Sequence, residues 1–544
     1  MPNMGFFRHY AAGFSLNIAS GPCMNTLPTE HLEPGIFSPM GAPFIVIASF
    51  LVYLLHRWFK RPSVKHVKGP SSPSFWLGHE RVLRDQNNAG DLETKWRREY
   101  GTLYRTGGCF GQDVLVVCDP KTLEHVFRSS HPYLKSQDVI FILDLIVGKG
   151  LSSVDEETHH RQRKILNPAF SPAQFRKAQA IFQHCCDKLV NSMKESLTAS
   201  GTNEAINILQ WTSKVALDII GLASFRYDFG SLDGRNTELG QVMRHLFTAS
   251  QSNPTAFELI LVTLMRMLPH STLGLLRLIP TREIRLLTSV GTVAKKTARE
   301  VIAGHDEAQA PEGDGDVVDV LARARLAGKM QDDEIEAQLM TFVVAGHETS
   351  STSIAWLLYE LAAHPEHQSI IRAELRQSND YDSMSFLNAA IKEALRLHPI
   401  AHSLIRTAPH DDVLPLSGGK TLAIPKGQTL VCSVYLYNRL PSLWGDDAEE
   451  WNPARFFEQT LPVSLGVYAN LMTFSAGSRS CIGWRFAVME MQTILANLIL
   501  HFEFSLPEGG VEVLHFPGSP GVVPIVKGEA RLGTQVPLRV RVLH

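Results

Sequence analysis

The sequence predicts a mainly α-helical protein with a minor β component, preceded by a single N-terminal transmembrane helix. Three observations lead to this prediction: an uncharged apolar stretch at 36–55, helical periodicity over most of 120–400, and short alternating segments at 101–120 and 410–436. The 544 residues are 44% hydrophobic, which is ample for a large buried core. Because composition does not shift after residue 69, we expect one large domain behind the anchor.

The apolar stretch 36–55 reads "IFSPMGAPFIVIASFLVYLL", and as a helix it would rise about 30 Å, the thickness of a bilayer's hydrocarbon core. Basic residues follow at once in "HRWFKR", whereas the preceding segment carries few. The positive-inside rule then places residues 1–35 in a lumen and makes 36–56 the anchor. A cleaved signal peptide or a buried core helix is the alternative, but signal peptides start closer to the first residue.

A basic, proline-containing segment at 57–75 follows the anchor and includes "VKGPSSPSFWLGH". Proline fixes φ and restrains the residue before it, so we expect a stiff, non-helical hinge here and the globular domain at 76–544. A second apolar stretch, 259–280, is interrupted by charged residues and prolines. It is either a pair of core helices or a surface that dips into the bilayer.

Within the globule, the segment 101–120 predicts a strand, a turn and a second strand. Helical periodicity is strongest in three places: 316–365, 385–399 and the apolar run after Cys481. Strand character returns over 410–436, and the last forty residues predict short strands and turns.

Charge and cysteine content exclude several classes of protein. A formal net charge of -2 gives no reason to expect nucleic acid as a partner. Seven cysteines, without any CxxC pair, argue against a disulfide framework and against a structural zinc site. We therefore expect the globule to lie in a reducing compartment.

One cysteine lies in an unusual loop, "FSAGSRSCIGWRFA". A thiolate is a strong, soft ligand for iron, and it needs positive charge and N–H donors to stay ionised. Gly477 and Gly483 would bring amides near the sulfur of Cys481, and Arg479 would project toward an anionic group of whatever is ligated. On these residues alone, Cys481 is either an inert buried cysteine or an iron ligand.

A second unusual stretch, "FVVAGHETSSTS", lies within the helix expected from 332 to 364. Gly346 costs that helix about 1 kcal/mol relative to alanine, and the hydroxyl residues at 349–353 compete with its backbone hydrogen bonds. A widened turn here would admit a small molecule or water, with Glu348 and Thr349 as an acid and a hydroxyl for proton delivery. The alternative is an ordinary kinked core helix.

A third stretch, "IKEALRLHP", places Glu393 and Arg396 on one face of a helix, where they can pair. Most such pairs are solvated and contribute little to stability. The apolar neighbours of this pair indicate burial, and a buried pair needs further partners. Arg455, in "WNPARF", offers one.

Together, these segments resemble the cytochrome P-450 haem-thiolate monooxygenases. "FSAGSRSCIG" matches the FxxGxRxCxG signature at every defined position, "AGHETS" matches the oxygen-activation motif, and "NPARF" matches the PxRF segment. Glu393 and Arg396 match ExxR, and the order and spacing of all four motifs agree. The resemblance covers about residues 69–544, and the anchor is similar to the microsomal eukaryotic form. The overall style is similar to fungal members that oxidise terpenoid-like metabolites.

The resemblance implies a role for each matching residue. Cys481 is the expected axial ligand of the iron of haem b, and Glu348 with Thr349 is the expected oxygen-activation pair. The remaining cofactor-binding residues, several of them at the haem propionates, are expected to be Phe474, Gly477, Arg479, Arg406, Arg163 and His159. A buried network supporting the cysteine loop is expected from Glu393, Arg396 and Arg455.

Two positions depart from the family pattern. His159 stands where members often have tryptophan, four residues before Arg163. A histidine can still donate to a propionate, although His160 or Arg161 could make that contact instead. Ala454 replaces the usual acid of PERF, which we expect to be a mild change.

By resemblance, this is a membrane-anchored enzyme that inserts one oxygen atom from O₂ into a lipophilic small molecule, by hydroxylation or epoxidation. We expect it in the endoplasmic reticulum membrane as a single-pass protein, in contact with lipid, with the haem-thiolate catalytic domain in the cytoplasm. No flavin or nicotinamide domain follows Cys481, so electrons are expected from a separate NADPH-dependent cytochrome P-450 reductase. Cytochrome b5 is a further candidate partner.

The substrate pocket is expected to be apolar, with lining from 139–147, 341–345, 402–404 and the neighbourhood of 521–524. Lys164, Arg161 and Arg485 are candidates for docking the reductase. One rival hypothesis is a reductase-independent haem-thiolate isomerase or dehydratase, and another is a non-catalytic haem-binding membrane protein. Both are disfavoured because this chain keeps the Glu348–Thr349 pair, which rearranging relatives typically lose.

Overall fold

The computed structural model describes residues 63–543, apart from 201–203, 236, 242–254, 269–273, 275–280, 304–314, 459–463 and 519–520, together with residues 48, 49, 52, 53, 56, 59 and 60. The chain divides into two units, Met1–Phe59 and Lys60–His544. The expected luminal segment and most of the expected anchor lie outside the described residues. Among the residues that are described, no helix is both long and apolar enough to cross a membrane.

The larger unit contains a five-stranded sheet in the order β1-β2-β8-β5-β3. Its strands are β1 (Leu103–Gly107), β2 (Asp113–Val117), β8 (Thr429–Ser433), β5 (Ser403–Thr407) and β3 (Leu134–Lys135). The strand–turn–strand expected at 101–120 is therefore confirmed as β1 and β2. At the far edge, β3 pairs antiparallel with β5 and sets Lys135 opposite Arg406.

Three smaller sheets account for the remaining described strands. They are β4 (Ile206–Asn207) with β12 (Pro537–Val542) and β9 (Phe502–Ser505), β10 (Val513–Pro517) with β11 (Val522–Val526), and β6 (Asp412–Pro415) with β7 (Thr421–Ile424). The strands expected after 410 and near the C-terminus are thus present. At 434 the expected strand character ends, because Val434–Tyr437 forms a short helix, α17, capped by the Ser433 hydroxyl.

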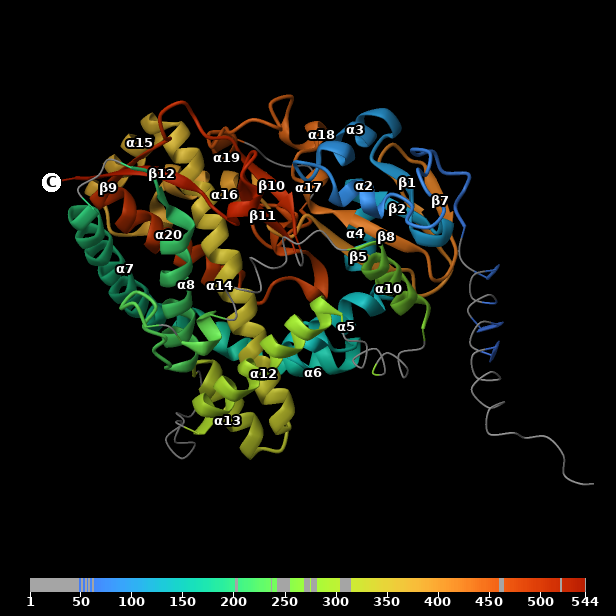
Figure 1. Cartoon of the computed structure of the whole chain (residues 1–544), viewed down its shortest axis with the longest axis horizontal. Helices are drawn as coiled ribbons and strands as arrows, with labels where there is room; N and C mark the ends of the chain where they lie inside the picture. Colours follow the sequence, from blue (N-terminus) through green and yellow to red (C-terminus); the bar gives the residue numbers. More distant parts are fainter. Residues whose placement is uncertain are drawn as a thin grey trace, which may run out of the picture. The chain divides into compact units, whose positions relative to one another are not determined.

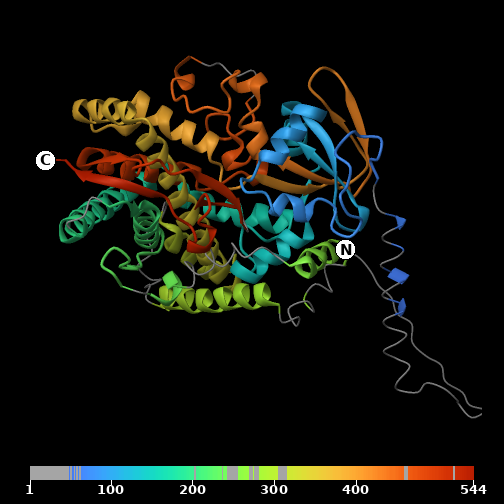
Figure 2. The same cartoon turned by 45° about the horizontal axis from the view of Figure 1, so that its top comes forward.

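Helices make up most of the unit, as the sequence predicts (Figures 1 and 2). The longest is α14 (Asp332–Ala363), which runs through the middle of the fold and packs against α8 (Ile208–Phe225), α20 (Trp484–His501) and α12 (Arg282–Ala303). The other helices that bear on the site are α4 (Pro120–Arg128), α5 (Gln137–Val147), α6 (Glu156–Leu166), α10 (Ala256–Met267) and α16 (Ser385–Leu397). The rest are α2 (Glu80–Arg84), α3 (Asp91–Tyr100), α7 (Pro172–Ser200), α13 (Val317–Leu326), α15 (Pro365–Gln377), α18 (Pro441–Trp444) and α19 (Arg455–Glu458).

The helical periodicity expected over 316–365 belongs to two helices, α13 and α14. Asp316 caps the first and forms a capping box with Asp319. The second begins after Gln331, which forms a capping box with Glu334 in an acidic first turn. Between them the chain turns at Gly328, whose φ of +63° suits glycine.

The widened turn expected near Gly346 is not present, because α14 is continuous from Asp332 to Ala363. Gly346 instead lies where a side chain of α8 approaches closely. A Cβ atom at this position would come within 2.9 Å of the Cδ1 atom of Ile220. The glycine therefore reflects tight packing of two helices rather than a local distortion of one.

Two further expectations concern the hinge and the second apolar stretch. From Val64 onward, the segment assigned to the hinge lies against β1, since the Arg105 amide donates to the Lys68 carbonyl over 2.9 Å. In the second apolar stretch, the described part forms α10, which buries Leu259, Leu261 and Met265. These three side chains belong to the core of the unit.

Candidate active site

The Cys481 loop lies between a short 3-10 helix (η7, Gly477–Arg479) and α20. The Cys481 amide donates to the carbonyl oxygen of Phe474 over 2.8 Å, which closes the loop on itself. Burial raises the pKa of the Cys481 thiol, and a hydrogen bond from the Gly483 amide opposes that rise. The expectation that backbone N–H groups approach the sulfur is met by Gly483.

Cys481 differs from the other described cysteines because its side chain is exposed, whereas theirs are buried. Its raised pKa nevertheless reflects dense protein around the sulfur. An accessible thiol can reach a ligand that approaches the loop.

Gly477 allows this loop to form. Its φ is +69°, a conformation that other residues adopt at a cost, and a Cβ atom here would overlap the carbonyl oxygen of Phe127 in α4. Gly483, in contrast, has a φ of -91°, so its backbone conformation does not require glycine. Of the two glycines singled out in the sequence, Gly477 is the one that the geometry demands.

A second accessible surface lies on α14. Ala345 and Thr349 are exposed although most of the surrounding helix is buried, and their spacing of four residues puts them on one face. The Thr349 hydroxyl donates to the Ala345 carbonyl over 2.5 Å. Since α14 packs on α20, the helix that starts just after Cys481, the two accessible surfaces belong to neighbouring elements.

Glu348, beside Thr349, is an acid whose proton is tightly held. Burial raises the pKa of its carboxyl to about 8, so the group is mostly protonated at neutral pH. The His347 ring lies next to this carboxyl, with Nδ1 3.7 Å from a Glu348 oxygen. A protonated acid next to a hydroxyl on an accessible helix face is suited to proton delivery.

Positive groups converge beside the cysteine loop. Arg479 binds the Glu156 carboxylate over 3.0 Å, and Arg163 donates to the Ser480 carbonyl over 2.5 Å. Arg406 is buried on β5, where its guanidinium lies 5.1 Å from the centre of the Phe127 ring. The structure thus brings the three arginines expected at the propionates to one edge of the loop.

His159 belongs to the same group. It is buried on α6, and burial together with nearby Arg479 and Arg163 lowers the pKa of its ring to about 3. Its neighbours His160 and Arg161 are exposed, and Arg161 is engaged with Glu334. Of these three residues, His159 is the one whose side chain lies among the arginines.

Lys135 is a member of this group that the sequence did not reveal. It lies in the two-residue strand β3 opposite Arg406, and its amine donates to the Ser152 carbonyl over 2.7 Å. Burial, then the charges of Arg479 and Arg406, lower the pKa of its amine to about 7. A two-residue strand carries no periodicity, so only the sheet register identifies this lysine.

The Glu393 carboxylate lies at the centre of a buried ion network. Arg396 binds it with two hydrogen bonds of 2.7 and 2.8 Å, and both side chains are fully buried. Arg455 binds the same carboxylate over 3.0 Å. A buried ion pair requires additional hydrogen bonds, and the bidentate contact with Arg396 and the further contact with Arg455 supply them.

Asn438, which the sequence analysis did not single out, connects this network with the cysteine loop. Arg396 donates to the Asn438 carbonyl over 2.9 Å, and the Asn438 side chain accepts from the Met472 amide over 3.1 Å. The same side chain donates to the Thr473 hydroxyl over 2.9 Å. Phe474, which follows directly, accepts the hydrogen bond from Cys481.

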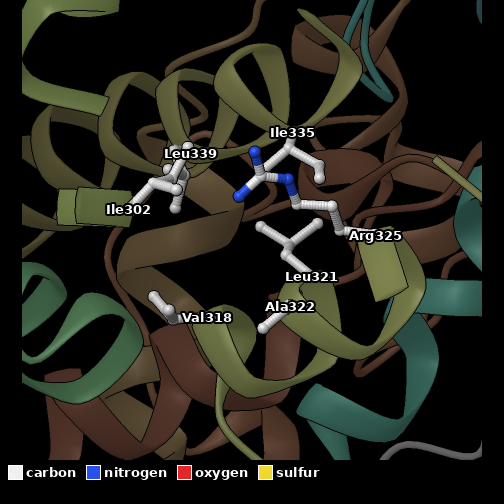
Figure 3. Close-up of a pocket in the computed structure, with 7 residues that line it drawn as sticks. All are labelled: Ile302, Val318, Leu321, Ala322, Arg325, Ile335 and Leu339. Atoms are coloured by element: carbon white, nitrogen blue, oxygen red, sulfur yellow. The ribbon is translucent and has the colours of Figure 1, made fainter. Parts of the chain in front are cut away.

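A separate apolar pocket lies where α12, α13 and the start of α14 meet (Figure 3). Its lining residues are Ile302, Val318, Leu321, Ala322, Arg325, Ile335 and Leu339. Arg325 at its edge binds Asp332 over 2.8 Å. None of the residues expected to do chemistry lines this pocket, so it is not part of the candidate site.

The residues around the loop fit a haem group in two respects. An accessible cysteine with an N–H donor at its sulfur suits an axial iron ligand. Within the cluster of positive side chains, Glu156 is the carboxylate that binds Arg479. The other positive side chains therefore remain to match the two propionates of a haem. The donor set therefore agrees with the cofactor that the motifs imply.

Comparison with known proteins gives the same family. The family model described as "Cytochrome P450" matches residues 68–529. Among similar curated proteins, cytochrome P450 monooxygenase claQ of Ampulloclitocybe clavipes is 31% identical, over 92% of this chain and 97% of its own. Cytochrome P450 monooxygenase 205 of Postia placenta is 29% identical, over 93% of this chain and 98% of its own.

These matches cover nearly the whole length of both this chain and its relatives, and both relatives are fungal proteins. The family model spans the Cys481 loop, α14 and the Glu393 network together. The family's cofactor is haem b, which the residues around Cys481 fit. The chain therefore belongs to the cytochrome P450 family and is an oxidoreductase of the monooxygenase type.

Proposed function

We propose that this protein is a membrane-anchored monooxygenase that hydroxylates or epoxidises a lipophilic, terpenoid-like small molecule. Its electrons come from a separate NADPH-dependent reductase. The observation that carries the proposal is the combination of an accessible Cys481 with an accessible Thr349 beside the protonated Glu348. Such a pairing of a metal ligand with a proton source suits O₂ chemistry rather than simple haem storage.

Each group in the site has a specific task. Haem, when held by Cys481, supplies the O₂-activating chemistry. Arg163, Arg406 and Arg479 bind its carboxylates. Glu348 holds a proton on its carboxyl, and the Thr349 hydroxyl, now bound to the Ala345 carbonyl, turns to pass that proton inward.

A lipophilic substrate is supported by an apolar hollow that includes part of the segment 139–147, although none of the residues expected to do chemistry lines it. A hollow between α5, α10 and α12 is lined mostly by apolar residues: Phe141, Ile142, Leu145, Leu261, Val262, Met265, Ile284 and Leu287, with Glu258 and Thr281. Three of these lie in the segment 139–147 that the sequence assigned to the pocket. Apolar lining with few polar groups favours apolar ligands.

Within the 402–404 segment, His402 and Ser403 have different surroundings. The His402 ring packs against the rings of Tyr435 and His515, at 4.7 and 5.6 Å between ring centres. Ser403, the first residue of β5, is exposed. Because the His402 ring is packed against other rings and Ser403 is accessible, we assign Ser403 rather than His402 to the pocket side.

The proposed anchor is the 36–56 segment, and the proposed location is the endoplasmic reticulum membrane with the catalytic domain in the cytoplasm. Reductase docking is supported by the exposed side chains of Lys164 and Arg485, which lie on α6 and at the start of α20. Arg161 is less available because Glu334 binds it. Cytochrome b5 is a second candidate donor for the same basic face.

The function is tested by expressing the full chain in microsomes with or without an NADPH–cytochrome P450 reductase and supplying a panel of terpenoids. We expect an oxygenated product whose formation needs NADPH, the reductase and O₂, with one oxygen atom from ¹⁸O₂ incorporated. Turnover that is equal without NADPH and reductase would instead identify an isomerase or dehydratase. Absence of product across the panel, with ligand responses unchanged by Thr349→Ala, would favour a non-catalytic haem protein.

A further inference from the structure

The His347 ring joins α14 to α8, directly before the proposed proton donor Glu348. The ring is buried, and its Nε2 atom lies 2.9 Å from the Ser213 hydroxyl and 3.0 Å from the Ser213 carbonyl oxygen. The two helices pack side by side through the middle of the fold (Figure 1). One residue of α8 therefore holds the ring from two directions.

These two contacts determine which ring nitrogen carries the hydrogen. A carbonyl oxygen can only accept, so the 3.0 Å contact requires a hydrogen on Nε2. The Ser213 hydroxyl can accept as well as donate, so it is compatible with the same arrangement. A neutral imidazole has one ring hydrogen, and charging a buried ring is costly. The Nδ1 atom of His347 therefore carries no hydrogen and presents a lone pair.

The lone pair of Nδ1 faces the Glu348 carboxyl. Nδ1 lies 3.7 Å from a Glu348 oxygen, which is longer than a hydrogen bond but close enough for a dipole to act in a buried site. Because the negative end of the ring dipole is turned toward the carboxyl, an ionised Glu348 is disfavoured and a protonated one is favoured. The orientation of the ring thus adds to the effect of burial.

The other groups around Glu348 do not offset this effect. Of the ionisable groups in the part of the chain that the structure describes, the His347 ring is the one in close contact with this carboxyl. From α8 the neighbouring polar group is Ser213, which is neutral. From α20 it is Glu490, an acid beside Ser350 whose pKa burial raises to about 8. Neither helix brings a positive charge that would stabilise the carboxylate of Glu348.

We infer that His347 is a positioning residue for the oxygenation reaction: Ser213 fixes its ring so that the bare Nδ1 faces Glu348 and keeps the proton on that acid. The inference rests on the proposed role of Glu348 as the proton donor. His347 itself neither gives nor takes a proton in this role, so no bond to its ring is made or broken.

The inference fixes the sign of an effect. Removing the Nδ1 lone pair should make the Glu348 carboxylate easier to form, so the midpoint of its titration should fall. We expect a fall of about one pH unit, which is a tenfold loss of proton affinity. A positively charged His347 ring would have the opposite effect, because its removal would take away a charge that stabilises the carboxylate.

The test is an infrared titration of the full chain over pH 6 to 10, following the C=O stretching band of protonated carboxyl groups. Glu490 contributes to the same region, so the Glu348 band is identified as the one that is lost in Glu348→Gln. The main variant is His347→Gln, whose amide N–H can still donate to the Ser213 carbonyl but which has no Nδ1. A second variant, His347→Leu, fills the space with an apolar side chain, and thermal unfolding checks that each protein is folded.

Both variants at position 347 should lower the midpoint of the Glu348 band. Ser213→Ala should leave it unchanged, because the carbonyl that fixes Nε2 belongs to the backbone. The control His501→Gln changes a histidine at the end of α20 that lies 3.4 Å from the Lys194 amine, and it should not move the midpoint.

An unchanged or raised midpoint in the variants of His347 would overturn the inference, and so would an equal shift in His501→Gln. A large shift in Ser213→Ala would also overturn it, because Nε2 would then be an acceptor. The titration needs neither substrate nor turnover. Failure of the proposed function is recognised separately, because reduced wild-type protein would then lack the thiolate-type Soret band with carbon monoxide.

Discussion

The amide of Cys481 donates a hydrogen bond of 2.8 Å to the carbonyl oxygen of Phe474. This bond is the last in a connected path that starts at the buried Glu393 carboxylate and passes through Arg396, Asn438 and the Met472 amide. The sulfur is therefore positioned by groups far away in the sequence. A change at either end of the path should alter the site in a distinguishable way.

Replacing Cys481 with serine should remove the iron ligand without disturbing this path. The backbone amide that binds Phe474 is kept, whereas a serine hydroxyl is a poor substitute for a soft thiolate. We expect the reduced variant to lose the thiolate-type Soret shift with carbon monoxide while its unfolding temperature without haem stays close to that of the wild type. A variant that retains the shift would show that another residue is the ligand.

Glu393→Gln should damage the other end of the path. The substitution keeps the shape of the side chain but leaves the buried Arg396 and Arg455 without their shared negative charge. Breaking a buried ion pair in this way costs about 3–5 kcal/mol. We expect a lower unfolding temperature and a lower haem content per polypeptide, measured by thermal unfolding and pyridine haemochrome absorbance.

A matched control for this variant is Asp85→Asn. Asp85 binds Arg81 over 2.8 Å, but both side chains are about 42% exposed, so the pair is solvated. Such surface pairs contribute roughly 0–1 kcal/mol. If the two substitutions lowered the unfolding temperature equally, the Glu393 network would contribute no more to stability than a solvated surface pair.

The sequence predicts regular elements well where local signals agree. The helix expected from 332 to 364 is found at Asp332–Ala363, because an acidic first turn starts it and Pro365 ends it. The reason for Gly346 was misjudged, since the close approach of Ile220 is a tertiary contact that one helix's sequence does not reveal. A local sequence pattern identifies a residue that is unusual in a helix, but it does not identify the neighbouring residue that makes it necessary.

In the candidate site too, some residues could be predicted from the sequence and others could not. The motif residues around Cys481 lie together in space, because the family pattern records which residues act as a unit. Lys135 and Asn438 were missed, since one lies on a two-residue strand and the other acts through its position beneath the loop. Their contributions depend on sheet register and on hydrogen bonds between distant segments, neither of which leaves a periodic signal.

Gly477→Ala should be far more harmful than an ordinary substitution at a glycine with positive φ. The new Cβ atom would overlap the Phe127 carbonyl, which belongs to the backbone and cannot move aside easily. The alanine would also have to adopt a left-handed backbone conformation. We expect loss of haem binding and reduced stability, measured by Soret absorbance and thermal unfolding.

Gly418→Ala separates these two causes. Gly418 has a φ of +86°, and a Cβ atom there would meet nothing within 4 Å. This variant therefore carries the conformational cost alone, about 1 kcal/mol, and should bind haem normally. Equal effects at both positions would mean that the contact between α4 and the cysteine loop is unimportant.

Glu348 gives the most direct prediction about pH. Burial raises the pKa of its carboxyl to about 8, so the protonated form, which is the one able to donate, predominates at neutral pH. As pH rises through 8, the proton is lost, and kcat should fall on the alkaline side. Over the same range, more of the NADPH consumed should end as hydrogen peroxide, because Glu348 supplies protons less effectively.

Glu348→Gln separates this acid from other groups that titrate near the same pH. The amide is similar in shape and cannot ionise, so the variant should have a lower kcat at pH 7 and no alkaline fall near pH 8. Thr349→Ala, which removes the hydroxyl that rests on Ala345, should lower the ratio of product to NADPH but keep the alkaline fall. An alkaline limb that survives in Glu348→Gln would assign the titration to another residue and leave Glu348 a structural role.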